Sequence, residues 1–313
     1  MPARPVPSEW PALPYSEWEE TRRTIHLYSQ ILGKIRLALS PPRPGWLGTP
    51  LNLTTRGLTT GPMPWGTAAI EILLNFVDHR LVILATDGWI RQIPLSPARC
   101  VADVYAEIMR ALTDFGAPVD IWTRPQEVAD LTPLDENRHD CTYDPASVRT
   151  FFKVLTATNA VFDEWQSDFF GKSSLQFWWG AFDLSTARFT GKRLEPPADA
   201  GYIMRWDLDT EHYSAGWWPG DERFPEPAFY AYAHPMPTGV ESTPDIPGAT
   251  WNADLGEWIL RYEDARATGD VRSAVLGFLE GTWRAVGTAS GWDLDAFRYE
   301  PPPPSPARGE GSS

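Results

Sequence analysis

The sequence predicts an α+β protein in which antiparallel β-sheets pack against long helices, arranged as two similar helix–strands–helix halves. Helical periodicity is clear in two long stretches, residues 16–39 and 145–169. Between them, three β-rich runs at residues 70–77, 81–86 and 89–95 are separated by Asp-His and Asp-Gly turns. Short turns between such runs are typical of an antiparallel meander.

The first helix is expected to begin at Ser16, because its hydroxyl and the Glu19 carboxylate have the spacing of a capping box. Apolar side chains recur along it at helical intervals, and prolines after residue 40 end it. His26, Gln30 and Lys34 form a second stripe at i, i+4 spacing. We expect this stripe to be a solvated polar face, with the wall of a site as the alternative.

Residues 51–60 alternate in polarity and predict one strand before the meander. After the meander, Ser96 and Pro97 have the pattern of a helix start. Cys100 falls within this second helical pattern and is expected to be a small core residue. Gly116 ends the helix, and residues 119–122 predict a short strand.

The central stretch of the chain, residues 171–193, follows a long helix that begins at Asp144 and Pro145. Alternate side chains of a strand face opposite sides, and Gly180 marks a break or bulge in this one. One side suits a core, namely Phe177, Trp179, Phe182 and Leu184. The other side combines polar and aromatic groups, namely Gln176, Trp178, Asp183 and Ser185.

Residues 226–235 predict a second strand with one polar-aromatic side. Phe229, Ala231 and Ala233 alternate with Tyr230, Tyr232 and His234. The segment before it, residues 214–220, is expected to be a loop, and residues 258–262 another strand. A last helix is expected over residues 271–289.

The predicted organisation has five parts: an N-terminal arm (1–14), a first α+β half (15–122), a linker (123–144), a second α+β half (145–298) and a disordered tail (299–313). An internal repeat is suggested because residues 51–60 and 182–191 align without gaps. Leu53, Thr55 and Thr59 then match Leu184, Thr186 and Thr190. Chance similarity between two Thr-rich strands is the alternative.

Composition narrows the class of protein. The net charge of −14 argues against binding of duplex nucleic acid, which needs a basic surface. No apolar run has the length of a membrane span. Two cysteines are too few for a disulfide framework, which favours a reducing compartment and predicts a cytoplasmic protein. The oligomeric state is left open.

Several motifs together resemble a bacterial family known only as domain of unknown function 5996. They are HLYSQILGKIRLAL, TTRGLTTGPMPWG, NFVDHRLVI, GKSSLQFWWGAFDLSTARFTGKR, SAGWWPG, EPAFYAYAHP and LGEWILRYED. The resemblance extends from about residue 10 to residue 295 and implies no known reaction. It also implies a departure, since family members tend to carry histidines where this chain has Gly48, Gln176 and Thr210. Loss of a histidine site for metal or proton transfer, and a rebuilt pocket used in specialised metabolism, would follow.

The leading hypothesis is an enzyme without a nucleotide or metal cofactor that performs acid/base chemistry on an apolar or aromatic metabolite. Isomerisation, cyclisation, elimination and hydrolysis fit such a site. Asp183 or Glu226 would be the acid or base, while Arg188, Lys172 or Arg56 would stabilise negative charge. The remaining substrate-binding candidates are Gln176, Trp178, Ser214, Trp217, Trp218, Tyr230 and Tyr232.

Three alternatives stay open. A non-catalytic binding protein could use the same tryptophan-rich pocket, and a metal-dependent enzyme is a further possibility. An interaction protein could present its aromatic loops to a partner. Asp183 and Arg188 could also form a structural ion pair, and Glu226 could fix a loop.

Overall fold

The computed structural model describes residues 10–242 and 246–300. Its helices are α1 (Tyr15–Leu39), α2 (Val101–Phe115), α3 (Pro145–Gln166), α4 (Tyr202–Asp207), α5 (Tyr262–Ala267) and α6 (Val271–Ser290), with 3-10 turns η1 (Pro44–Trp46), η2 (Val240–Ser242) and η3 (Asp295–Phe297). Its strands are β1 (Asn52–Thr54), β2 (Gly57–Thr59), β3 (Met63–Trp65), β4 (Ala68–Asn75), β5 (Arg80–Ala85), β6 (Ile90–Pro94), β7 (Gln176–Trp178), β8 (Asp183–Arg193), β9 (Thr210–Trp218), β10 (Ala228–His234), β11 (Thr250–Asn252) and β12 (Glu257–Arg261).

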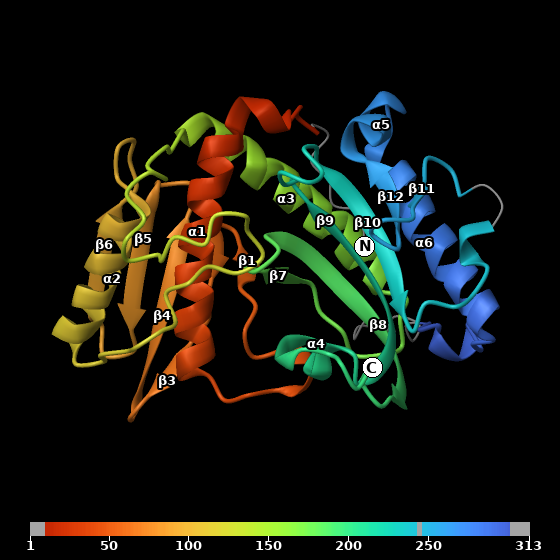
Figure 1. Cartoon of the computed structure of the whole chain (residues 1–313), viewed down its shortest axis with the longest axis horizontal. Coiled ribbons are helices and arrows are strands. Elements are labelled where there is room, and N and C mark those ends of the chain that lie inside the picture. Colours follow the sequence, from red (N-terminus) through yellow and green to blue (C-terminus); the bar gives the residue numbers. More distant parts are fainter. Residues whose placement is uncertain (1–9, 243–245, 301–313) are drawn as a thin grey trace, which may run out of the picture.

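Two antiparallel sheets form the framework, which confirms the predicted α+β class (Figure 1). The first has the order β1-β2-β4-β5-β6, with β3 paired to β4, and the second has the order β11-β12-β10-β9-β8-β7. Their edges meet where Leu51 and Phe177 exchange backbone hydrogen bonds of 2.8 and 2.9 Å. One hydrophobic cluster draws on both halves, and in it Trp18 of α1 stacks on Phe151 of α3. The two halves therefore share a core.

Both halves place a helix before their edge strand and a helix after their last strand, as the sequence predicts. The gapless alignment, however, joins unlike elements. Residues 51–60 form a hairpin rather than the single strand predicted, because the chain turns at Thr55 and Arg56 and pairs Thr54 with Gly57. Residues 183–193 form one continuous strand. By position in the sheets, β1 corresponds to β7 and β2 to β8.

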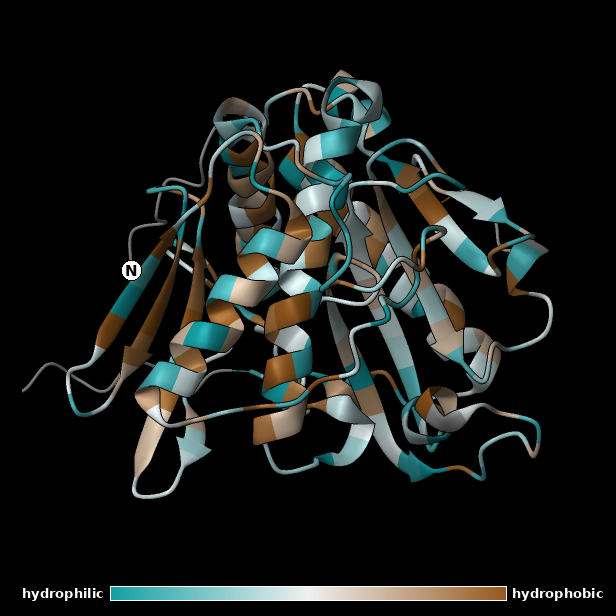
Figure 2. Ribbon diagram, turned by 60° about the vertical axis from the view of Figure 1, so that its left-hand side comes forward, coloured by the Kyte–Doolittle hydropathy of each residue, from teal (hydrophilic) through white to brown (hydrophobic). Residues whose placement is uncertain are grey.

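The two sheets differ in the chemistry of their strands. The long strands of the first sheet are mostly brown in Figure 2, whereas those of the second are paler and partly teal. In the second sheet the buried side of β9 and β10 is apolar: it includes Ala215, Trp217, Phe229 and Ala231. Helices α3 and α6 cover this side, and the Tyr213 hydroxyl contacts Thr282 of α6 at 2.6 Å. The opposite side carries the polar and aromatic residues.

Four local predictions are wrong. Helix α2 begins at Val101 rather than at Ser96 and Pro97. Helix α1 starts one residue early, at Tyr15, with an extended Pro14 at the N-cap and no side-chain cap. Residues 119–122 form no strand. Residues 214–218 belong to β9 rather than to a loop, because they pair with both β8 and β10. The prediction of a loop was based on Gly216, Trp217 and Trp218.

The two cysteines form a disulfide, which corrects the expectation that Cys100 is an unpaired core residue. Cys100 is the N-cap of α2, and Cys141 lies at the end of the long segment between α2 and α3. The bond ties this segment to α2. It also removes the argument for a reducing compartment, because disulfides are rare there.

The disulfide can be tested by mass spectrometry. Protein denatured under non-reducing conditions with iodoacetamide should take up no label, whereas reduced protein should take up a label on both Cys100 and Cys141. Labelling without reduction would show that the bond does not form in the purified protein.

The N-terminal arm is ordered where it is described. The Tyr262 hydroxyl donates to Pro11 O at 2.8 Å, and Arg266 Nε donates to Trp10 O at 2.9 Å. The predicted disordered tail lies almost wholly outside the described residues, as does the start of the arm. Among the helices of the described ranges, none is long and apolar enough to cross a membrane.

Candidate functional site

The face of the second sheet opposite α3 and α6 gathers most of the predicted site residues. Strand register places Gln176 opposite Ser185 and Trp178 opposite Asp183. It also places Ser214 opposite Tyr232 and Gly216 opposite Tyr230. We call this surface the acidic aromatic face, and its members are Gln176, Trp178, Asp183, Ser185, Ser214, Trp218, Tyr230, Tyr232 and Glu257. In Figure 1 it is seen in front of α3 and α6, with α4 at one end.

Asp183 and Tyr230 are joined by a hydrogen bond in which the tyrosine hydroxyl donates to the carboxylate. Tyr230 is on β10 and Asp183 on β8, so the tyrosine ring must cross the intervening strand β9. Gly216 makes this possible. A Cβ atom at Gly216 would lie 2.4 Å from the Tyr230 hydroxyl oxygen, a distance that real Cβ atoms do not adopt.

The Gly216→Ala variant tests this arrangement. The new methyl group should displace the Tyr230 ring and lower the free energy of unfolding by about 1–3 kcal/mol. Denaturant unfolding measures the change. In a Tyr230→Ala background, which removes the ring, the same substitution should cost much less. Equal costs in both backgrounds would contradict the packing described.

Two carboxyl groups on this face have pKa values shifted to near neutrality. Burial raises the pKa of Asp183 to about 7; the hydrogen bond from Tyr230 opposes this shift, and the Glu127 and Glu257 carboxylates add to it. Burial alone raises the pKa of Glu257 to about 7. Tyr230 has a pKa raised well above its usual value by burial and by Asp183, so it remains a proton donor. The face therefore holds groups that can gain or lose a proton near pH 7.

The turn that precedes Asp183 is strained. Phe182 has φ of 62°, a left-handed conformation that is rare for a bulky residue. Glu127, from the segment between α2 and α3, has φ of 56° and approaches Gly180 in this turn. Strained backbone of this kind is concentrated at functional sites.

Helix α1 holds both of these segments through its second polar stripe, so the expected solvated face is wrong. His26, Gln30 and Lys34 are at most 4% exposed. His26 Nε2 donates to Gly180 O at 2.8 Å, and burial lowers the His26 pKa to about 3, which keeps the ring neutral. Gln30 exchanges hydrogen bonds of 2.7 and 2.9 Å with the backbone of Gln126.

Lys34 completes this contact by donating to Arg124 O at 2.9 Å. The residues predicted as a linker, 123–144, thus pack on α1 and bring Glu127 to the face. The i, i+4 spacing in the sequence marked His26, Gln30 and Lys34 as one stripe. The sequence did not show that residues 123–144 would cover this stripe.

Arg188 lies on the opposite side of the sheet from Asp183. Its guanidinium is 3.4 Å from the centre of the Trp165 ring, and Nη2 donates to Asp168 Oδ1 at 2.7 Å. The side chain is 3% exposed. Of the two predictions for this arginine, the geometry matches the structural ion pair, but with Asp168 rather than with Asp183.

Four other candidates do not contact the Asp183 carboxyl. Trp217 is fully buried in the core on the α3 side, and Lys172 is exposed. Arg56 pairs with Asp78 at 2.7 Å on the first sheet. Glu226 lies 3.3 Å from Nη1 of Arg261, which is on the same side of the sheet as Trp218 and Tyr230. None of the three cations expected to stabilise negative charge is therefore close to Asp183.

Sequence reasoning missed several groups on or beside the face. Glu127, Glu257 and Asp207 are carboxyls whose pKa values are raised first by burial. His212 and His234, whose rings are 6.0 Å apart, lie near Asp207 at the end covered by α4. Strand alternation placed His234 on this side, whereas nothing local marks Glu127 or Asp207.

One group among the described residues has the donors for a metal ion: Asp130, His139 and Asp140. The Asp140 carboxylate is already engaged, because it pairs with Arg23 and accepts from Asn137 Nδ2 at 2.8 Å. A guanidinium bound to one ligand opposes a cation there. The residues fit a structural ion-pair cluster better than a metal centre.

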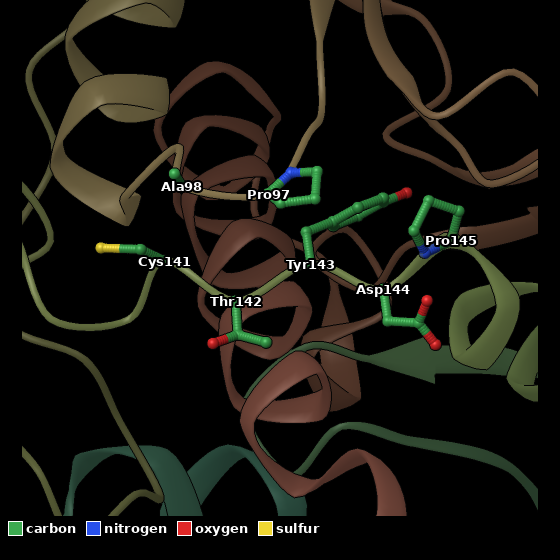
Figure 3. Close-up of a pocket in the computed structure, with 7 residues that line it drawn as sticks. All are labelled: Pro97, Ala98, Cys141, Thr142, Tyr143, Asp144 and Pro145. Atoms are coloured by element: carbon green, nitrogen blue, oxygen red, sulfur yellow. The ribbon is translucent and has the colours of Figure 1, made fainter.

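Two cavities lie away from the acidic aromatic face. The larger, about 470 Å³, is lined by Pro97, Ala98, Cys141, Thr142, Tyr143, Asp144 and Pro145, and Figure 3 shows that its wall is mainly proline, alanine and the Tyr143 ring. The smaller, about 90 Å³, lies beside Trp46 and Trp206 and is bordered by Gly48. Neither is lined by a predicted catalytic residue.

Comparison with known proteins places the whole fold in one family. No curated protein and no solved structure matches the chain. A family model does match residues 10–299, which is nearly all of the sequence. The chain belongs to the Family of unknown function (DUF5996).

Proposed function

We propose that the protein is an enzyme that uses Asp183 as a general acid or base on a small molecule bound at the acidic aromatic face. One observation carries the proposal: a 5% exposed carboxyl, with a pKa of about 7, lies among aromatic side chains and is hydrogen-bonded to Tyr230. General acids and bases are most effective when their pKa is near the working pH. Isomerases, lyases, cyclases and hydrolases all use such a group.

Tyr230 supports the role of Asp183. Its hydroxyl donates to the carboxylate and so fixes the orientation of one oxygen. The Trp218 and Tyr232 rings lie 5.5 and 6.2 Å from the Tyr230 ring and extend the aromatic surface beside it. A substrate with an apolar or aromatic part would pack here.

The experiment first searches for a compound that the protein converts and then tests whether the conversion depends on Asp183. The purified protein is incubated with a metabolite extract, and mass spectrometry records which compounds are consumed. Asp183→Asn should slow that consumption by about 10²–10⁴-fold, as expected for loss of a general acid or base. Glu164→Gln is the matched control and should change the rate little, because Glu164 of α3 pairs with Arg272 of α6 on the opposite side of the sheet.

A ligand that binds but is never converted would contradict the proposed enzymatic function and would favour a non-catalytic binding protein. Conversion that Asp183→Asn leaves intact would contradict the assigned role. The cytoplasmic location predicted from the cysteine count is not part of this proposal.

A further inference from the structure

The acidic aromatic face has carboxylates and aromatic rings, and within the described ranges no cation forms an ion pair with Asp183, Glu127 or Glu257. The groups that most affect the Asp183 carboxyl are Tyr230, Glu127 and Glu257. Arg188, Lys172 and Arg56 lie elsewhere. Arg223 acts on Glu127 but is itself paired with Asp221 at 3.0 Å. Arg261 of β12 is on the same side of the sheet, but it is paired with Glu226 at 3.3 Å. The Asp183 and Glu257 carboxylates therefore have no cationic partner among the described residues.

The Ser185 and Glu257 side chains on this face have no hydrogen-bond partner among the described residues. The Ser185 side chain is 6% exposed, and its hydroxyl makes no hydrogen bond to any described residue. Register places Ser185 between Gln176 and Gly216, on the Asp183 side of the sheet. The partly buried Glu257 carboxyl likewise makes no hydrogen bond or ion pair within the described ranges. Neither residue is among those with a fully enclosed, unpartnered side-chain atom, so both groups are accessible and free to hydrogen-bond a ligand.

The aromatic rings supply a second attraction for positive charge. The Tyr230 and Tyr232 rings are nearly parallel, with an interplanar angle of 14°, and Trp218 meets Tyr230 at 66°. Faces of tryptophan and tyrosine attract cations through their π electrons, most strongly when water is excluded. Rings combined with carboxylates are the chemistry that recognises organic ammonium groups.

We infer that the ligand of the acidic aromatic face is an organic cation, an amine or quaternary ammonium compound with an apolar or aromatic part. This inference rests on the proposed site and names its substrate class. The positive group would lie against Tyr230, Tyr232 and Trp218, between the Asp183 and Glu257 carboxylates, while the Ser185 hydroxyl would accept or donate a hydrogen bond.

Binding of a cation should release protons. At pH 7 the free carboxyls of Asp183 and Glu257 are partly protonated, and a nearby positive charge favours their ionised forms. Tyr230 and Tyr232 from β10, Glu127 from the segment before α3 and Asp207 at the end of α4 face the same region. The cations of this region, Arg223 and Arg261, are paired with Asp221 and Glu226.

Isothermal titration calorimetry with benzyltrimethylammonium chloride tests the inference, with benzyl alcohol and sodium benzenesulfonate as neutral and anionic probes. At pH 7 and fixed ionic strength the cation should bind about tenfold or more tightly than the alcohol, and the sulfonate should not bind. Titrations in phosphate and in Tris should give different enthalpies, because protons are released to buffers with different ionisation enthalpies.

Glu257→Gln and Trp218→Leu should each weaken cation binding several-fold, and Glu164→Gln, on the opposite side of the sheet, should not. Equal binding of the alcohol and the cation, or a cation affinity unchanged in both variants, would overturn the inference. These outcomes are separable from the proposed function. Asp183-dependent turnover of a neutral compound would refute the inference that the ligand is a cation and would support the proposed enzyme. Cation binding without any turnover would support the inferred ligand class and contradict the proposed enzyme.

Discussion

Asp183→Asn should stabilise the protein at pH 8 and lose that advantage as the pH falls toward 4. The native carboxyl has a pKa of about 7, against 3.8 for an ordinary aspartate. The unfolded chain therefore loses this proton at lower pH than the native protein does. Stability falls between about pH 4 and pH 7, and the full penalty, at most about 4 kcal/mol, is present above pH 7.

Asparagine has no carboxyl proton to lose, so the stability of Asp183→Asn should not fall in this way between pH 4 and pH 7. Urea unfolding of both proteins at pH 4.5, 6 and 8 measures the difference, with Glu226→Gln as the control. A difference that stays constant across this range would contradict a raised Asp183 pKa. Together with the expected loss of turnover, higher stability would mark Asp183 as a group retained at a cost to the fold.

Arg188→Met should destabilise the protein by about 3 kcal/mol at every pH from 6 to 8. Methionine fills similar space but cannot donate to Trp165 O, Gln166 Oε1 and Asp168 Oδ1. It also loses the guanidinium stacked over the Trp165 ring. Thermal or urea unfolding measures the cost.

Arg223→Ala is the matched control, because that side chain is 80% exposed and should change stability by less than about 0.5 kcal/mol. A stable Arg188→Met protein that loses turnover would instead assign Arg188 to the chemistry, as the sequence suggested. The structural account predicts that ligand binding at the acidic aromatic face survives in the folded variant.

The sequence predicted the faces of the strands better than their pairing. Alternation placed Asp183 with Gln176 and Trp178, and Tyr230 with Tyr232, and the register confirms both groupings. It succeeded because side-chain direction in a strand depends only on local periodicity. The hairpin at residues 51–60 was missed, since a turn at Thr55 and Arg56 carries no glycine or proline at its centre.

Groups brought together by tertiary contacts could not be predicted. Glu127 lies in a segment without periodicity, and tertiary contacts such as the hydrogen bonds from Gln30 and Lys34 bring that segment to the face. Arg188 is five residues from Asp183 and therefore points to the other side of the strand. The disulfide depended on two cysteines 41 residues apart, whose approach no local pattern encodes.

The central claim is that the Asp183 carboxyl titrates near neutral pH on this face. A ¹³C NMR titration of aspartate-labelled protein, with Asp183→Asn to assign the signal, measures its pKa directly. The predicted result is one carboxyl resonance with a midpoint near pH 7 that is missing from the variant. A midpoint below about pH 5 would contradict the claim, because a carboxyl ionised at that pH is an ordinary aspartate.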